Sequence, residues 1–191
     1  MARPRDQDRR RQLLEQTLAY AARHGLADLS LRPLAHALGT SDRMLLHYFG
    51  SKENLIGQAL AAGRPNVPAL LDEATPQALA NLARRLWHDM TNGGEQEPRV
   101  RLLLQVLALA ITKPSPYTEY ARAAIADWVQ PLASGFRSNG MHADEAQARA
   151  TTLVSGLRGL ALDHYVTGDR ARTTAAAEAL ITTMSRGADL P

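Results

Sequence analysis

Residues 42–49, DRMLLHYF, gather side chains of several chemical kinds in one short stretch. A carboxylate, a guanidinium, a thioether and an imidazole come from Asp42, Arg43, Met44 and His47. Four other side chains recur at helical spacing and are expected to pack inward, at Leu34, Leu38, Leu45 and Tyr48. The mixed polar set must then face outward. A guanidinium can donate two parallel hydrogen bonds to one guanine, so this face could read the edges of base pairs.

Two short helices joined by Gly-Thr-Ser must position this set. Ser30 is expected to cap the helix LRPLAHAL through its hydroxyl, and Gly39 is expected to end it at a positive φ. Ser41 can cap the next helix two residues later. Because this joint is too short for antiparallel stacking, the helices should cross steeply, as in a helix-turn-helix. The second helix would enter a major groove, and Lys52, in a third helix capped by Ser51, would lie beside a phosphate.

A simple corner between two helices is the alternative to this interpretation. Arg43 would then be a solvated surface residue, as codon bias toward Arg makes plausible. Ala35, which is small enough for close helix approach, coincides here with Gly39 and the Ser-Lys restart, which favours DNA binding. Thr40 counts against it, because such motifs usually bury an aliphatic residue there. Five arginines at the amino end could form a disordered arm on DNA or a soluble tail: Arg3, Arg5, Arg9, Arg10 and Arg11.

Composition and charge narrow the class of protein. The chain has 191 residues, 45% of them hydrophobic, and no cysteine, which excludes disulfides and thiolate metal sites. Residues 1–58 contain nine Lys and Arg against six Asp and Glu, while residues 59–191 balance at 13 and 13, so the amino end favours a polyanion. No apolar run approaches the roughly 20 residues of a membrane span, and residues 1–16 are basic and polar. We therefore expect a cytoplasmic protein without a membrane partner.

Helical periodicity predicts an all-α fold of about nine helices. The first should run from about Asp8 to His24, where Gly25 stops it. Five longer helices with wide apolar stripes are expected within residues 75–94, 97–114, 115–140, 143–169 and 170–187. GRPNVP, residues 63–68, marks a boundary between the short helices and the long ones.

The first 60 or so positions resemble the amino-terminal domain of the tetracycline-repressor (TetR) family of transcriptional regulators. The matching pieces are the first helix ending at Gly25, then Ser30 and Arg32, Ala35 and Gly39, and the run TSDRMLLHYFGSKENLI. The resemblance implies a helix-turn-helix DNA-binding domain at residues 1–50, a connecting helix at 51–64, and a ligand-binding and dimerisation domain at 65–191. It also implies a regulator, expected to be a repressor, that a small molecule releases from a palindromic operator.

Carried over to this sequence, the resemblance implies phosphate contacts by Arg32 and Lys52. It also implies one by Tyr48, at the end of the helix expected to enter the major groove (the reading helix, residues 42–49). The expected DNA-binding set is Arg32, Ser41, Asp42, Arg43, Met44, His47, Tyr48 and Lys52. Two positions depart from the family pattern. Leu46 replaces a Tyr that commonly contacts the backbone, and Arg43 replaces a small residue, so Arg43 is the strongest candidate for specificity.

Two glycines inside a helix point to an interface in the second half. Gly156 and Gly159 each cost about 1 kcal/mol relative to Ala, which close approach of another helix would offset. With an apolar stripe on the last helix they predict a four-helix homodimer interface, from Gly156, Gly159, Leu180, Ile181 and Met184. Packing of the glycines within one chain is the alternative. The resemblance implies the same dimer, whose reading helices would lie one duplex turn apart.

An effector pocket is implied mainly by the resemblance. Its expected residues are Trp87, Met90, Tyr120, Trp128 and His164, with Tyr117, Tyr165 and His88 as further candidates. Core packing is the alternative for each of them. The effector would favour a dimer shape that no longer matches the groove spacing, and the helix at residues 51–62 would transmit the shift.

Catalysis is not expected from this sequence. Asp163 and His164 are adjacent on a helix and point about 100° apart, so neither can orient the other. The six histidines lack metal-ligand spacing, and no Gly-rich phosphate loop is present. We therefore expect no enzyme, no cofactor and no metal. The alternative function is a helical dimer that retains the amino-terminal head but serves as a protein- or ligand-binding scaffold without specific DNA binding.

Overall fold

A computed structural model describes residues 4–27, 29–64, 66–67, 75–94, 96–112 and 115–185. These residues form nine helices and no strand, which confirms the all-α prediction for the described part of the chain. The helices are α1 (Pro4–His24), α2 (Leu31–Ala37), α3 (Asp42–Phe49), α4 (Lys52–Ala62), α5 (Pro76–Thr91), α6 (Glu97–Thr112), α7 (Pro116–Ser138), α8 (Ala143–Thr167) and α9 (Arg170–Ser185). Each of the five long segments expected to be helical contains one of α5 to α9.

The chain divides into two compact units that do not follow its order. Unit 1 contains residues 1–65 and 98–122, and unit 2 contains residues 66–97 and 123–191. Unit 1 therefore includes most of α6 and the first turns of α7 as well as the four amino-terminal helices. The segment expected to form one regulatory domain at 65–191 thus supplies helices to both compact units.

α1 begins earlier than expected and ends where expected. It starts at Pro4 instead of Asp8, because proline is tolerated in a first turn whose N–H groups lack partners. Its buried positions, Leu13, Leu14, Thr17 and Ala21, follow helical spacing and face the core of unit 1. Gly25 follows the last turn with φ +74°, and its N–H donates to the Ala21 carbonyl at 2.8 Å.

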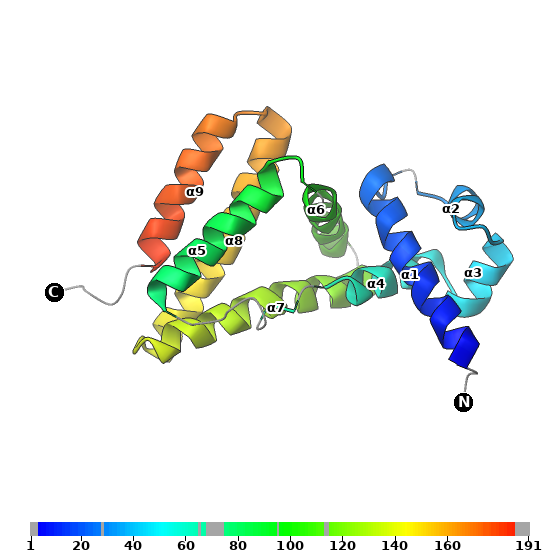
Figure 1. Ribbon diagram of the computed structural model, residues 1–191, viewed down its shortest axis with the longest axis horizontal. Helices are drawn as coiled ribbons and strands as arrows, with labels where there is room; N and C mark the ends of the chain where they lie inside the picture. The colour runs from blue at the N-terminus through cyan, green and yellow to red at the C-terminus, as the bar shows by residue number, and fades with distance from the viewer. Residues whose placement is uncertain are drawn as a thin grey trace. The chain divides into compact units, whose positions relative to one another are not determined.

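α2 and α3 meet at a corner (Figure 1), with Leu38, Gly39, Thr40 and Ser41 between them. Gly39 has φ +63°, a conformation that favours glycine, which confirms its expected role. Ser41 accepts a hydrogen bond from the Met44 N–H at 3.2 Å and so caps α3 as expected. Ser30 occupies the cap position of α2 but its side chain accepts no capping bond, so that detail of the prediction was wrong.

The core of unit 1 joins all of its helices. Leu34, Leu38 and Leu45 are buried as expected, but Phe49, at 4% exposure, fills the last inward position in place of Tyr48. Tyr48 is half-buried at the edge of this core. The correction follows from helix geometry, because residue 49 lies one turn after Leu45 and thus on the same face.

α6 and the start of α7 complete that core from far along the sequence. Leu102 and Val106 of α6 and Tyr117 of α7 are buried among the amino-terminal residues. The Gln105 Oε1 accepts a hydrogen bond from the Leu26 N–H at 2.8 Å, 79 positions away. Burial, with a smaller effect from Glu53 of α4, raises the pKa of Tyr117 to about 12.

Unit 2 is built around α5, α8 and α9. α8 and α9 lie side by side and are joined by a short turn, and α5 packs against both (Figure 1). Their shared core is rich in alanine, with Ala146, Ala150, Ala161 and Ala177 at 0% exposure, which lets the helix axes approach closely. Leu153, Leu157 and Ile181 are larger members of this core, to which α7 contributes Val129, Leu132 and Phe136.

Candidate nucleic-acid interface

α3 presents a mixed polar face on the side opposite its buried residues. Leu45 and Phe49 are 1% and 4% exposed, whereas the other side carries the exposed residues Asp42, Arg43, Met44 and His47. All four therefore lie outward, as the sequence predicts. Two large apolar side chains share this surface, because Met44 is 41% exposed and Leu46 is 42% exposed.

The first turn of α3 is fixed by its own side chains. The Ser41 hydroxyl accepts from the Met44 N–H, and the Asp42 carboxylate accepts from the Arg43 N–H at 2.8 Å. Within the described part of the chain, the Arg43 guanidinium has no hydrogen-bond or ion-pair partner. Its five N–H donors are thus available to a ligand.

Lys52 and Arg32 differ in how tightly they are held. The Lys52 Nζ donates to the Leu29 carbonyl at 3.0 Å, and the side chain is half-buried. This bond ties the start of α4 to the segment before α2, and two ammonium donors remain for a phosphate. Arg32 is exposed in the first turn of α2. The expected phosphate contacts of both residues stay predictions.

The Tyr48 hydroxyl donates a hydrogen bond to the Asp6 carboxylate at 2.7 Å. This hydrogen bond, the largest cause, raises the pKa of Tyr48 above its usual value. The tyrosine comes from the last turn of α3 and the aspartate from the first turns of α1, 42 positions apart. Sequence reasoning missed this pair, because no local pattern links two residues so distant.

The basic residues near the amino end belong to α1, so for Arg9, Arg10 and Arg11 the expectation of a disordered arm was wrong. Arg9 donates to Gln12 at 2.9 Å, and Arg11 pairs with Asp8 at 3.1 Å. The Arg10 guanidinium lies 5.3 Å from the centre of the Phe49 ring and also donates to Gln58. Arg3 lies outside the described residues.

The residues expected to bind an effector separate between the two units. Trp87, Met90, Trp128 and His164 belong to unit 2, while Tyr117 and Tyr120 belong to unit 1. In unit 2 the Trp87 Nε1 donates to Thr174 at 3.2 Å, and Tyr165 donates to the Met90 carbonyl. The Trp87 and His164 rings meet edge to face, 6.4 Å apart. His88 is exposed.

The residues expected at a dimer interface have three different environments. A Cβ at Gly156 would lie 2.4 Å from a Leu180 methyl of the same chain, so this glycine serves close packing of α8 on α9. Ile181 is 1% exposed and fills the core of unit 2, so its side chain is not available to a partner. Leu180 and Met184 are half-buried, and Gly159 is exposed with open space around it.

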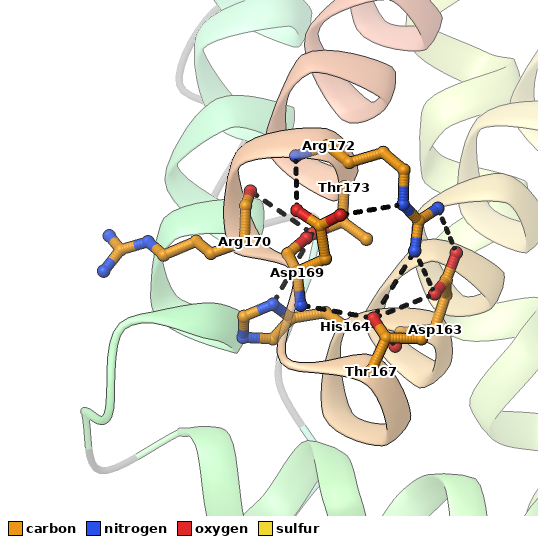
Figure 2. A network of polar contacts seen from close by, with 7 residues as sticks. All are labelled: Asp163, His164, Thr167, Asp169, Arg170, Arg172 and Thr173. Atoms are coloured by element: carbon orange, nitrogen blue, oxygen red, sulfur yellow. Dashed lines mark hydrogen bonds and ion pairs between the residues drawn. The ribbon is translucent and has the colours of Figure 1, made fainter.

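A cluster of polar contacts at the turn between α8 and α9 was not anticipated (Figure 2). Arg172 reaches both oxygens of Asp163, at 2.7 and 2.8 Å, and also contacts Asp169 at 3.2 Å. The Arg172 hydrogen bond is the main cause that lowers the pKa of Asp163. Sequence reasoning considered Asp163 only beside His164. Its hydrogen-bond partner, Arg172, lies nine positions later.

The described residues contain no group of three or more His, Cys, Asp or Glu side chains that could bind a metal ion. Among the described helices, none is both long enough and apolar enough to cross a membrane.

Comparison with known proteins matches the amino-terminal part of this arrangement to a family model. Residues 13–59, which include α2, α3 and most of α4, match the sequence model of the bacterial regulatory proteins of the tetR family. No curated protein matches the chain.

Solved structures resemble nearly the whole chain. A transcriptional regulator from Rhodococcus sp. Rha1 has a TM-score of 0.75 at 23% identity, over 95% of this chain and 98% of that one. A regulator from Saccharomonospora viridis, solved in complex with choline, has a TM-score of 0.75 at 22% identity, over 94% and 97%. NalD, the secondary repressor of the MexAB-OprM multidrug efflux pump in Pseudomonas aeruginosa, has a TM-score of 0.65 at 18% identity, over 96% and 100%.

At these identities the structural likeness establishes the fold, and the match to the tetR-family model concerns residues 13–59. α3, whose exposed face carries the predicted DNA-binding residues, lies inside the matched range. Residues 13–59 thus match the model of the tetR family, and nearly the whole chain has the fold of solved transcriptional regulators.

Proposed function

We propose that this protein is a transcriptional repressor that binds a palindromic operator as a homodimer and is released by a small molecule. The observation that supports DNA binding best is the face of α3, where Arg43 is exposed and unpaired opposite the buried Leu45 and Phe49. A helix of this size fits a major groove, and its outward side chains can reach base edges. NalD, which shares the fold, is a repressor.

Selection of binding sequences from a pool of random duplexes tests this function. We expect an enriched site with two-fold symmetry, because two α3 helices of a dimer would read equivalent half-sites. Affinity for the enriched site should fall steeply between 50 and 200 mM salt, by about 10³-fold if each dimer neutralises roughly six phosphates. A protein that enriches no sequence and has no measurable duplex affinity would instead support the alternative function, a protein- or ligand-binding scaffold without specific DNA binding.

The homodimer is proposed from an exposed stripe on α8. Its residues recur at alternating spacings of three and four and therefore lie on one helix face: Thr152, Ser155, Gly159, Leu162 and Val166. Leu162 is 52% exposed and Val166 is 77% exposed, and exposed apolar side chains in line with small ones are typical of helix interfaces. Gly159 has open space around it in the single chain. In a dimer it would let the partner's helix approach closely, which would offset the cost of a glycine inside a helix.

A charge on this stripe tests the dimer. Leu162→Glu should convert the dimer to a monomer in sedimentation velocity, because pairing would bury two carboxylates. Ile111→Glu on α6, where the native side chain is 86% exposed, is the matched control and should remain dimeric. A wild-type protein that sediments as a monomer at micromolar concentration would contradict the proposal.

The small-molecule effector is proposed to bind in unit 2 near Trp87, His164 and Tyr165. Their rings gather on α5 and α8, and aromatic side chains suit apolar or cationic ligands. A thermal-shift screen that starts with choline, which the Saccharomonospora viridis regulator binds, should find a compound that raises the melting temperature. The same compound should weaken operator binding, by linkage. Stabilising compounds that leave operator affinity unchanged would contradict an effector role.

A further inference from the structure

Tyr48 and Asp6 form a hydrogen bond at the edge of the face that would meet DNA. The Tyr48 Oη donates to Asp6 at 2.7 Å. The Tyr48 side chain is half-buried and packs against the core of unit 1. Asp6 is exposed. The pair therefore joins the end of α3 to the start of α1 at the protein surface.

A tyrosine hydroxyl has one hydrogen to donate, and a DNA phosphate oxygen is an acceptor of the same kind as a carboxylate oxygen. Both acceptors are negatively charged. A phosphate that approaches Tyr48 must therefore displace Asp6 from the hydroxyl and come close to a second negative charge. The two acceptors cannot use the same hydrogen, so occupation by Asp6 opposes occupation by a phosphate.

The other groups around this hydroxyl would favour a phosphate. Arg9, one turn after Asp6 on α1, acts on Tyr48 with its positive charge. The His47 ring centre lies 5.8 Å from that of Tyr48 and belongs to the outward face of α3. Arg10 lies over the adjacent Phe49 ring. Asp6 is the single carboxylate with a described contact to Tyr48, and Arg9 is the positive charge that acts on the same hydroxyl.

From this geometry we propose that Asp6 restrains DNA affinity by holding the Tyr48 hydroxyl in the free protein. Asp6 is thus an affinity-setting residue that competes with the phosphate backbone and carries no information on base sequence. The inference rests on the proposed DNA-binding function and concerns one contact within it.

Substitution of Asp6 tests this role. Asp6→Asn removes the charge, and Asp6→Ala removes the acceptor as well. We expect both variants to bind the selected operator and an unrelated duplex about five-fold more tightly, as expected for one charge interaction at the protein surface. Fluorescence anisotropy at several salt concentrations measures this. Asp8→Asn is the matched control, because Asp8 is also on α1 but pairs with Arg11, and it should tighten binding clearly less.

Tyr48→Phe distinguishes an effect that acts through the Tyr48 hydroxyl from a general effect of removing the Asp6 charge. In the wild-type background this change should lower affinity less than in the Asp6→Ala background, because Asp6 competes for the hydroxyl only in the wild type. In the Asp6→Ala background it should remove most of the gain. Circular dichroism melts verify that each variant is folded before binding is measured.

Three results would overturn the proposal: no gain for the Asp6 variants, an equal gain for Asp8→Asn, or a gain that survives Tyr48→Phe. Each presupposes that the wild-type protein binds a duplex. If the wild-type protein binds none, the proposed function itself fails, and that result is distinguishable because it precedes any comparison of variants.

Discussion

Arg43 and Lys52 are both cations near helix starts, yet the structure places them in different environments. Arg43 is exposed on α3 with no partner among the described residues, so its guanidinium can approach a base edge without a competing bond. Lys52 is half-buried and donates to the Leu29 carbonyl, so its stem and one of its three donors serve the protein itself. Of these two cations, Arg43 is therefore the one expected to influence which sequence is bound.

Arg43→Ala should relax the base preference at one position of each half-site. A bidentate Arg-to-guanine contact contributes roughly 1 to 3 kcal/mol of discrimination, so about 5- to 150-fold of preference would be lost there. Affinities for operators that carry each of the four bases at every position measure this effect.

Arg32→Ala is the control for that experiment. Arg32 is exposed on α2, and a phosphate contact there would weaken all sequences alike and reduce the salt dependence of binding. Equal losses for the two variants on every sequence would contradict the assignment of Arg43 as the specificity residue.

Single residues were predictable from sequence where their partners are local. Ser41 and Ser51 each cap a helix by accepting from an N–H three positions later, and the sequence pattern contains both members of each pair. The partners of Tyr48 and Lys52 are 42 and 23 positions away. No spacing rule reaches that far, so Asp6 and the Leu29 carbonyl emerge only when the helices are placed in space.

At the scale of elements, one arginine bridges the turn between α8 and α9. Arg172, in the first turn of α9, bridges Asp163 near the end of α8 and Asp169 in the turn itself (Figure 2). The three charges are exposed or half-buried, and Thr167 adds a hydroxyl at 3.2 Å from Asp163. This bridge links the end of α8 to the start of α9 across the turn.

The lowered pKa of Asp163 predicts how this turn responds to acid. The carboxylate binds its proton less readily in the folded protein than in the unfolded chain, whose pKa is about 3.9. The stability it contributes is thus fully present above that pH and is lost as the pH falls through the lower folded pKa. Between pH 7 and pH 3 the melting temperature should therefore fall more in the wild type than in Asp163→Asn.

Asp89→Asn provides the comparison for this acid response. Asp89 is an exposed carboxylate on α5 that has no ion pair among the described residues, so its replacement should leave the acid sensitivity of the wild type. An Asp163→Asn protein that is as acid-sensitive as the wild type would show that the bridge to Arg172 adds no stability.

At the scale of the whole molecule, periodicity predicted the helices but not the units they form. The apolar stripe of residues 97–114 indicates that one face of α6 is covered, and any apolar neighbour would satisfy that pattern. The structure places Leu102 and Val106 in the same core as α1 to α4. Which helices pack together is a property of tertiary contacts, so the sequence could suggest a boundary near residue 65 but not the return of residues 98–122 to unit 1.

The hydrogen bond from Leu26 to Gln105 tests the packing of α6 against the amino-terminal helices. Gln105→Leu leaves the partly buried Leu26 N–H without its acceptor, which costs about 1 to 3 kcal/mol. Hydrogen exchange at the Leu26 amide should become faster and the melting temperature should fall. Gln105→Glu retains an acceptor oxygen of the same reach and should protect the amide better than Gln105→Leu. Equal exchange rates in the wild type and both variants would contradict the contact.

The same packing predicts that the DNA-binding head is not an independent domain. A fragment of residues 1–64 lacks Leu102, Val106 and Tyr117, which are 1%, 0% and 8% exposed in the complete chain. Each large apolar side chain contributes about 1.5 to 3 kcal/mol when buried, and a small domain is stable by only about 5 to 15 kcal/mol in total. The loss of three such contacts should remove most of that margin. Circular dichroism should show no cooperative melt for the fragment, and the Leu45 amide should exchange much faster than in the full chain. A fragment with the same Leu45 protection as the full chain would show that α6 and α7 lie against a head that is already complete.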